Sequence, residues 1–460
     1  MSDTALRLLG AAAAVLVYAA LCLAVYRRER RRADGSAARA ALFAGNAGIE
    51  TPTLVLHGSQ TGQAEALAWQ TAEWLHCSGR PARVMPLNEA GAETLRGART
   101  ALFIASTYGE GDAPDGASLF AERVMGGALD LSSLRYAVLA LGDRQYANFC
   151  AFGRRLDHWL REAGAQRSFD RIDVDNAEPA ALAAWQARIG GGDAASAALP
   201  EAPLLPWRLA ERRLLNPGSI GGPVYLLSFT RPPGERSEAQ EPPEWESGDL
   251  VRLALGSDPA RPRDYSIASI PQDGVLQLLV RQERHPDGSL GAASGLLNSG
   301  LDIGENVHLR LRPHRLFRLG QNLRRPLLLI GNGTGLAGLR SHLRARAAIG
   351  EHENWLVFGE RQAQHDFLCR EELEAWQRDG VLRRLDMVFS RDQPERRHVQ
   401  HHLLQSHAEV RDWIERGAAI YVCGSLQGMA SGVDAALRQI AGAARIDELL
   451  AAGRYRRDVY

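Results

Sequence analysis

Three stretches between residues 53 and 160 each begin with a short apolar run that leads into a loop of small and polar residues. They read TLVLHGSQTGQAEALAWQTAEWL, ALFIASTYGEGDAPD and YAVLALGDRQYANFCAFGRRLDHWL. In the first and the third, a helical pattern follows the loop. Short apolar runs that alternate with helices are typical of a parallel, doubly wound sheet. Because ligands bind at the carboxyl ends of the strands in such sheets, the three loops predict a ligand site.

The first of these loops has the chemistry of a phosphate site, since hydroxyls and backbone N–H groups at the start of a helix bind anions. It contains Ser59, Gln60, Thr61, Gly62 and Gln63. All 54 basic residues of the chain are arginine, so no lysine follows the glycine and a nucleoside triphosphatase P-loop is not indicated. The other two loops carry Tyr108 and Tyr146, which could hold a flat ring between them.

Composition narrows the class of protein. A chain of 460 residues is long enough for two or three domains. Its formal net charge is zero, so it lacks the basic field that nucleic-acid binding requires, and we expect no nucleic-acid partner. The five cysteines are scattered and form no CxxC pair, which indicates neither a disulfide framework nor a metal or iron–sulfur site.

The amino-terminal segment predicts a membrane anchor. Residues 8–26 are uncharged and largely apolar, about the length that spans a bilayer, and five arginines follow within residues 27–32. A cleaved signal peptide would carry its charge before the apolar run instead. The positive-inside rule then predicts a single-pass protein of the inner (cytoplasmic) membrane with its catalytic domains in the cytoplasm.

The middle of the chain predicts an antiparallel barrel. Short strand patterns separated by turns begin near residue 206. Arg263 and Tyr265 alternate along one of them and would share a face, where a guanidinium can bind a phosphate and a ring can stack on a flat heterocycle. This pair suits a flavin nucleotide, although the same residues also fit an ordinary edge strand. The stretch GSLGAASGLLNSGL then opens a helix whose Gly-rich start suits a pyrophosphate.

The last third of the chain returns to strand, glycine loop and helix, beginning with PLLLIGNGTGLAGLRSHL. A later strand is followed by Ser390, Arg391 and Arg396. A hydroxyl and two guanidinium groups would suit the second phosphate of an adenosine ribose, whereas sites for the unphosphorylated nucleotide place an acid there. The alternative is a solvated basic loop.

From Thr53 to Tyr460 the motifs resemble the diflavin reductase family, which includes sulfite reductase flavoproteins and NADPH-haemoprotein reductases. In this family a flavodoxin-like FMN domain is fused to a ferredoxin–NADP reductase-like FAD and NADPH domain. The resemblance rests on the loops GSQTGQAE, STYGEGDAPD and LGDRQYANF, on RDYS, on the second glycine loop, on FGERQAQHDFLCREEL and on the terminal DVY. It implies FMN, FAD and NADPH as cofactors.

The resemblance also assigns residues. The FMN set is Ser59, Gln60, Thr61, Gly62, Gln63, Ser106, Thr107, Tyr108, Gly109, Leu141, Gly142, Asp143, Tyr146, Asn148 and Phe149. The FAD set is Arg263, Tyr265, Ser266, Gly291, Ala293, Ser294 and Tyr460. The NADP set is Gly333, Thr334, Gly335, Arg361, Ser390, Arg391, Arg396, His398 and Cys423. As catalytic residues it implies Ser266, Cys423 and Asp458 beside the nicotinamide and the terminal Tyr460 over the flavin.

The expected architecture is α/β: a transmembrane helix, a flavodoxin-like sheet, an FAD-binding antiparallel barrel and a Rossmann-like NADP-binding domain. The expected division is an anchor with its basic flank at 1–32, a linker at 33–51, the FMN domain at 52–189, a linker at 190–205, the barrel at 206–323 and the NADPH domain at 324–460. Longer family members carry a helical connecting domain for which this chain has no room. The orientation of the two flavin modules is therefore left open.

The expected activity is the passage of electrons from NADPH through FAD and FMN to a redox acceptor protein that contains haem. Two alternatives remain: a reductase of ferric iron or ferric chelates, and a non-enzymatic flavin-bearing scaffold. The loop with Glu110, Asp112 and Asp115 would steer a basic partner or be a solvated turn.

Overall fold

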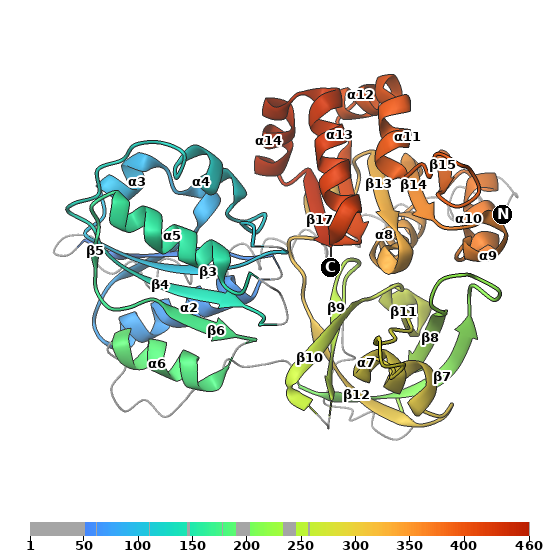
Figure 1. The fold of residues 1–460 in the computed structure, drawn as a ribbon, viewed down its shortest axis with the longest axis horizontal. Helices are drawn as coiled ribbons and strands as arrows, with labels where there is room; N and C mark the ends of the chain where they lie inside the picture. Colours follow the sequence, from blue (N-terminus) through green and yellow to red (C-terminus); the bar gives the residue numbers. More distant parts are fainter. Residues whose placement is uncertain are drawn as a thin grey trace, which may run out of the picture.

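Three β-sheets follow one another along the chain (Figure 1). The structure is a computed structural model. It describes residues 51–60, 62–109, 111–144, 148–176, 178–189, 203–232, 245–255 and 258–459.

The first sheet is parallel, with strand order β2-β1-β3-β4-β5 and with β6 also paired to β4. Its strands are β1 (Thr53–Gly58), β2 (Ala82–Pro86), β3 (Thr100–Ser106), β4 (Arg135–Gly142), β5 (Gln166–Arg167) and β6 (Ile172–Asp175). Its helices are α2 (Gln63–Cys77), α3 (Ala92–Arg96), α4 (Ser118–Arg123), α5 (Ala151–Glu162) and α6 (Pro179–Ile189), with a 3-10 turn at Leu87–Glu89. The parallel pairing confirms the predicted doubly wound sheet. Its central strands β3 and β4 are apolar on both faces, as expected for strands that helices cover on both sides.

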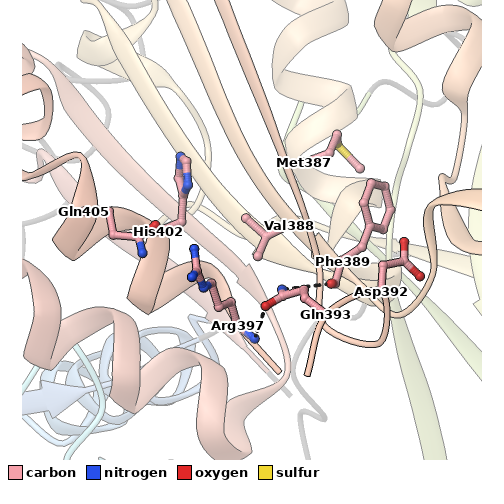
Figure 2. A pocket seen from close by; sticks show the side chains of 8 residues that line it. All are labelled: Met387, Val388, Phe389, Asp392, Gln393, Arg397, His402 and Gln405. Atoms are coloured by element: carbon pink, nitrogen blue, oxygen red, sulfur yellow. Dashed lines mark hydrogen bonds between the residues drawn. The ribbon is translucent and has the colours of Figure 1, made fainter. Parts of the chain in front are cut away.

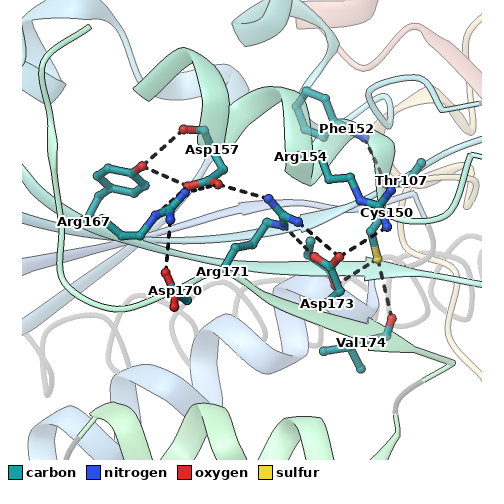
Figure 3. Close-up of polar contacts among 12 residues, drawn as sticks. Thr107, Cys150, Phe152, Arg154, Asp157, Arg167, Asp170, Arg171, Asp173 and Val174 are labelled. Carbon is teal, nitrogen blue, oxygen red and sulfur yellow. Dashed lines mark hydrogen bonds and ion pairs between the residues drawn. The ribbon is translucent and has the colours of Figure 1, made fainter. Parts of the chain in front are cut away.

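Helices cover both faces of this sheet. The helices α2 and α6 lie on one face, and α3, α4 and α5 lie on the other (Figure 1). Leu67 of α2 and Trp185 of α6 belong to one core, and Phe120 of α4 and Leu156 of α5 belong to the other. A buried ion network ties α5 to the far edge of the sheet (Figure 3): Asp157 accepts hydrogen bonds from the guanidinium groups of both Arg167, at 2.5 Å, and Arg171, at 3.1 Å. The two guanidinium groups compensate the buried carboxylate.

The second sheet is antiparallel, in the order β10-β9-β12-β7-β8-β11. Its strands are β7 (Leu205–Leu214), β8 (Val224–Thr230), β9 (Leu250–Leu255), β10 (Asp258–Ser266), β11 (Leu276–Arg281) and β12 (Asn306–Arg312). A bridge between Ile267 and Leu278 brings the two ends together, so the sheet curls into a barrel around an apolar core. Between β11 and β12 lie α7 (Ala292–Gly295) and a π-helical turn (Leu296–Gly300), and a 3-10 turn spans Pro271–Asp273.

The third sheet is parallel, in the order β15-β14-β13-β16-β17, as in Rossmann-type folds. Its strands are β13 (Leu327–Asn332), β14 (Asn354–Glu360), β15 (Arg384–Phe389), β16 (Ala419–Gly424) and β17 (Tyr455–Val459). Its helices are α8 (Leu336–Ala347), α9 (Ala363–Asp366), α10 (Arg370–Arg378), α11 (Val399–Gln405), α12 (His407–Glu415), α13 (Ser431–Ala441) and α14 (Ala443–Ala451). Short turns span Gly320–Asn322, Gly333–Gly335 and Leu426–Ala430.

The barrel and the third sheet share one hydrophobic core. Val224, Leu226 and Leu279 of the barrel pack with Leu336 and Leu339 of α8. This shared core fixes the barrel and the third sheet relative to each other. The expected domain boundaries fall between the three sheets. The division into domains stays a prediction.

The expected membrane anchor needs correction. Among the helices that the structure describes, from residue 51 onward with the gaps given above, none is long and apolar enough to cross a membrane. The longest of them, α2, has 15 residues, whereas a span needs about 20. Residues 8–26, on which the expectation fell, lie outside the described ranges. We withdraw both the transmembrane helix as part of the fold class and the inner-membrane location.

Candidate functional site

The loops after β1, β3 and β4 meet at the carboxyl edge of the first sheet. Gly62 precedes α2 with a φ of 86°, a left-handed conformation that favours glycine. The Ser59 hydroxyl oxygen accepts the backbone N–H groups of Gly62 at 2.9 Å and Ala64 at 3.3 Å, so it shapes the start of the helix. A Cβ added at Gly62 would meet no described atom within 4 Å, which leaves open space at this helix end. The arrangement fits the phosphate of FMN.

The second and third loops are held by their own backbone and side chains. The Thr107 hydroxyl oxygen accepts the N–H of Phe152 at 3.2 Å, at the start of α5 (Figure 3). Tyr108 and Asp112 close a tight turn with two backbone hydrogen bonds of 3.0 and 2.8 Å. A Cβ at Gly142 would lie 2.8 Å from the backbone nitrogen of Cys150, so this position has no room for a side chain.

The remaining predicted FMN residues are distributed over the same edge. Gln60 is buried after β1, and Gln63 is the first residue of α2. Ser106 ends β3, and Leu141 and Gly142 end β4. Gly109, Asp143, Asn148 and Phe149 follow those strands. Thr61 and Tyr146 lie outside the described residues. The roles of all of them stay predictions.

At the other predicted flavin site, Ser266, Cys423 and Asp458 lie together although they come from β10, β16 and β17. The Ser266 hydroxyl donates to Asp458 Oδ2 at 2.8 Å, and the Cys423 thiol lies 3.7 Å from the same oxygen. Burial, and then the neighbouring carboxylate, raise the pKa of the Cys423 thiol well above its ordinary value. The thiol therefore stays protonated and donates toward Asp458.

The predicted flavin-binding residues of the barrel come from two elements: Arg263, Tyr265 and Ser266 from β10, and Gly291, Ala293 and Ser294 from the start of α7. Tyr265 packs against the barrel core, and burial raises the pKa of its phenol to about 12. The Ser294 hydroxyl oxygen accepts from Gln282 Nε2 and from the backbone N–H of Glu283, both at 3.1 Å. Gly291 and Ala293 complete this turn, and a Cβ at Gly291 would lie 2.8 Å from the Cβ of Glu283. Tyr460, predicted to cover the flavin, lies outside the described residues.

The predicted NADP loop links β13 to α8. Gly333 has a φ of 58°, and Thr334 and Gly335 complete the turn. A Cβ at Gly335 would overlap the carbonyl of Cys423, so only glycine lets the loop lie this close to β16. Gly338 lies inside α8, and a Cβ there would approach the Phe317 ring to 3.0 Å.

The predicted 2′-phosphate residues lie in the loop after β15. Ser390 bonds through its backbone N–H and its hydroxyl to the carbonyl of Glu360, at 2.9 and 3.3 Å. Arg391, Arg396 and His398 are exposed. The Arg391 N–H donates to the carbonyl of Arg361 at 2.8 Å, which joins this loop to the end of β14.

A cavity of about 260 Å³ flanks this loop, between the edge strand β15 and α11 (Figure 2). Its lining is Met387, Val388, Phe389, Asp392, Gln393, Arg397, His402 and Gln405. Gln393 holds the loop in place: its Nε2 donates to the carbonyl of Phe389 at 3.0 Å and its Oε1 accepts the N–H of Arg397 at 3.2 Å. The cavity lies next to the predicted adenosine end of NADPH.

The last described strand, β17, contacts both predicted flavin sites: the loops at the edge of the first sheet, and the cluster of Ser266, Cys423 and Asp458. The Arg457 guanidinium bonds to Asp115 Oδ1, with its Nε at 3.0 Å. Burial alone would lower the pKa of Arg457, but the Asp115 carboxylate raises it well above its ordinary value. The Tyr108 hydroxyl donates to the carbonyl of Val459 at 3.2 Å, and burial and then Asp115 raise the pKa of this phenol.

His314 is a second link between the clusters. It lies after β12 and is fully buried. Its Nε2 is 3.1 Å from the carbonyl of Gln60, and its Nδ1 is 3.8 Å from Asp458 Oδ1. Neither His314 nor Arg457 was predicted from the sequence as a site residue. The only available signal for Arg457 was its place beside the predicted Asp458 on a strand, where adjacent side chains point to opposite faces.

A flavodoxin-type sheet, a barrel and a Rossmann-type sheet that converge on these loops define an oxidoreductase that uses flavins and a pyridine nucleotide. Residues 55–187 match the flavodoxin family, and residues 329–435 match the oxidoreductase NAD-binding domain family. The chain thus carries the two kinds of domain that diflavin reductases combine, and it is an NADPH-dependent flavin oxidoreductase whose cofactors are FMN, FAD and NADPH.

The curated relatives that support this are named sulfite reductase [NADPH] flavoprotein alpha-component. That of Bacillus subtilis (strain 168) is 26% identical over 542 aligned positions, which cover 90% of each chain. That of Neisseria meningitidis serogroup C (strain 053442) is 27% identical, over 88% of this chain and 89% of the relative. Because the 542 positions exceed the 460 residues of this chain, the relative has residues without a counterpart here.

Proposed function

We propose that this protein passes electrons from NADPH through FAD and FMN to a haem-protein acceptor, as the sulfite reductase flavoproteins it resembles would be expected to do. The observation that carries the proposal is that β17 contacts both candidate flavin sites. Asp458 contacts Ser266 and Cys423, while Arg457 and Val459 contact Asp115 and Tyr108. One strand therefore separates the two sites.

The cofactors supply the redox chemistry: NADPH gives two electrons as a hydride, and the flavins convert these into single electrons. The chain's residues position and tune them. We propose that the loops after β1, β3 and β4 hold FMN with the residues predicted above, including Thr61 and Tyr146. Arg263, Tyr265, Ser266, Gly291, Ala293 and Ser294, with Tyr460, would hold FAD.

Where the nicotinamide would bind, Ser266 and Cys423 both direct a proton at Asp458 Oδ2. This fixes the orientation of the carboxylate. A fixed negative charge would favour the positive ring that NADPH leaves behind after hydride transfer, because preorganised charge stabilises charge that develops in the reaction.

At the other end of the nucleotide, we propose that Ser390, Arg391 and Arg396 bind the 2′-phosphate and that Gly333, Thr334, Gly335 and Arg361 hold the pyrophosphate. His398 would stack on the adenine. The exposed guanidinium groups of Arg391 and Arg396 support this, since they remain accessible to a phosphate from solvent.

The proposed transfer of electrons through FMN to a haem protein is tested with a variant that loses FMN but keeps FAD. Gly62→Val forces a β-branched residue into a left-handed conformation at the phosphate loop, so FMN should be lost while FAD is retained. We expect the variant to lose NADPH-dependent reduction of cytochrome c, used as a haem-protein probe, and to keep reduction of ferricyanide. Cytochrome c reduction that survives the loss of FMN would contradict the proposal.

The ferric-reductase alternative is separated by a second comparison on the wild-type protein. We expect a higher kcat/KM for the haem protein than for ferric citrate. The reverse order would favour a ferric-chelate reductase. Absence of NADPH oxidation with every acceptor would favour a scaffold.

A further inference from the structure

The contact between the flavodoxin-type module and β17 centres on one buried ion pair. The side chains of Arg457 and Asp115 are only 17% and 13% exposed. Taking two charges out of water is costly unless they bond to each other, and a charge that loses its partner in such a place is strongly unfavourable. The pair therefore selects one orientation of the module on β17, because another docking that buried either charge would leave it without its partner.

Gln60 connects this pair to the predicted phosphate loop. Its Oε1 accepts the N–H of Asp115 at 2.8 Å, and its Nε2 donates to Asp115 Oδ2 at 3.1 Å. The same Nε2 donates to the backbone carbonyl of Arg457 at 2.8 Å. A single side chain thus joins the loop after β1, the loop after β3 and the last strand.

The alternation of side chains along β17 links the Arg457–Asp115 contact to the cluster around Asp458. Adjacent residues of a strand point to opposite faces, and here Arg457 points to Asp115 while Asp458 points to Ser266 and Cys423. The position of β17 is fixed on the second side by its parallel pairing with β16, in which Cys423 lies opposite Asp458. The ion pair that holds the flavodoxin-type module on Arg457 therefore also fixes the distance between this module and the cluster of Ser266, Cys423 and Asp458.

We propose that Asp115, Gln60 and Arg457 are positioning residues that hold the FMN module against the last strand during electron transfer between the flavins. The inference rests on the proposed function. The step it affects moves single electrons from reduced FAD to FMN, with NADPH as their source, and it makes or breaks no covalent bond.

The test separates the two flavin reductions in time. Wild-type protein and Arg457→Met are mixed anaerobically with NADPH, and the reduction of FAD and the later reduction of FMN are followed by absorbance. We expect the FAD phase to be unchanged and the FMN phase to slow by about tenfold or more, because a small misplacement of donor and acceptor is costly. Asp115→Asn should act in the same way, and Arg457→Lys, which keeps the charge, should restore part of the rate.

A matched control lies at the same interface. Arg315 and Glu65 form an ion pair of 3.1 Å between the two parts, but the Arg315 side chain is 69% exposed. Exposed ion pairs contribute little free energy to a contact, so Arg315→Met should leave the FAD phase and the FMN phase unchanged. Flavin content and thermal unfolding of each variant establish that it is folded.

Each outcome bears on a different claim. Wild-type protein with only one reduction phase would contradict the proposed function itself. Two phases in the wild type that persist unchanged in Arg457→Met and Asp115→Asn would overturn the positioning role. So would an equal slowing in Arg315→Met, or a loss of the FAD phase in a folded Arg457→Met variant.

Discussion

The hydroxyl of Ser266 donates a hydrogen bond of 2.8 Å to the carboxylate of Asp458, although 192 positions separate the two residues in the chain. Ser266 ends a barrel strand, and Asp458 lies on the last strand of the Rossmann-type sheet. The bond therefore joins the end of the predicted flavin site to the carboxyl end of the chain. This junction is where we expect the nicotinamide to meet the flavin.

Removing the Ser266 hydroxyl should slow the reduction of FAD by NADPH. Ser266→Ala leaves Asp458 without its best donor, so the carboxylate loses its fixed orientation, and we expect a loss of roughly 10²-fold in the first phase of anaerobic reduction. Binding of NADPH should change little. Ser228→Ala is the control, since Ser228 is also a buried barrel serine, bonded to Gln277. An equal loss in that variant would mean that the effect is one of barrel stability.

Arg391 should discriminate between the two pyridine nucleotides. Arg391→Ala removes one guanidinium group from the predicted 2′-phosphate site, so the KM for NADPH should rise by about tenfold or more. The KM for NADH, which has no 2′-phosphate, should stay nearly constant. Arg378→Ala, at the exposed end of α10, is the control. Equal effects of Arg391→Ala on both nucleotides would refute the contact.

The Asp157 network should set the acid stability of the flavodoxin-type module. Burial alone would raise the pKa of Asp157, but hydrogen bonds from Arg167 and Tyr136 outweigh it and hold the pKa below its ordinary value of 3.8. The carboxylate therefore contributes stability above its unfolded-state pKa, and this contribution is lost as the pH falls through the lowered folded-state pKa.

Asp157→Asn should lower the free energy of unfolding of this module by about 3 kcal/mol at neutral pH, because two guanidinium groups lose their buried partner. The difference between wild type and variant should shrink below about pH 4, measured by urea unfolding. Asp170→Asn is the control, since Asp170 binds the same Arg167 but is 96% exposed. A constant difference across this pH range would contradict the account.

The sequence predicted the parallel sheets well because their signals are local. Apolar runs, glycine loops and helical patterns follow one another within a few residues. The barrel was predicted to begin near residue 206, but its first recognisable strand pattern is PVYLLSFT, after β7. The sequence WRLAERRL of β7 mixes buried Trp207 and Leu209 with exposed charges, and its register shifts between Leu209 and Glu211. A bulge interrupts the alternation by which strands are recognised.

The contacts between modules could not be predicted, because they depend on where distant segments meet. Gln60 and Arg457 are 397 positions apart, and Gln60 and His314 are 254 apart. Nothing in the sequence around His314 indicates that its ring reaches both the phosphate loop and Asp458. The grouping of Ser266, Cys423 and Asp458 came from the family resemblance, and their catalytic roles stay predictions.

The most direct test of the central claim is a separate count of FAD and FMN in the purified protein, followed by anaerobic titration with NADPH. The account predicts one FAD and one FMN per chain, both of which are reduced by NADPH. FAD without FMN, in protein whose flavodoxin-type module is folded, would contradict it, because the loops after β1, β3 and β4 would then hold no flavin for electrons to reach.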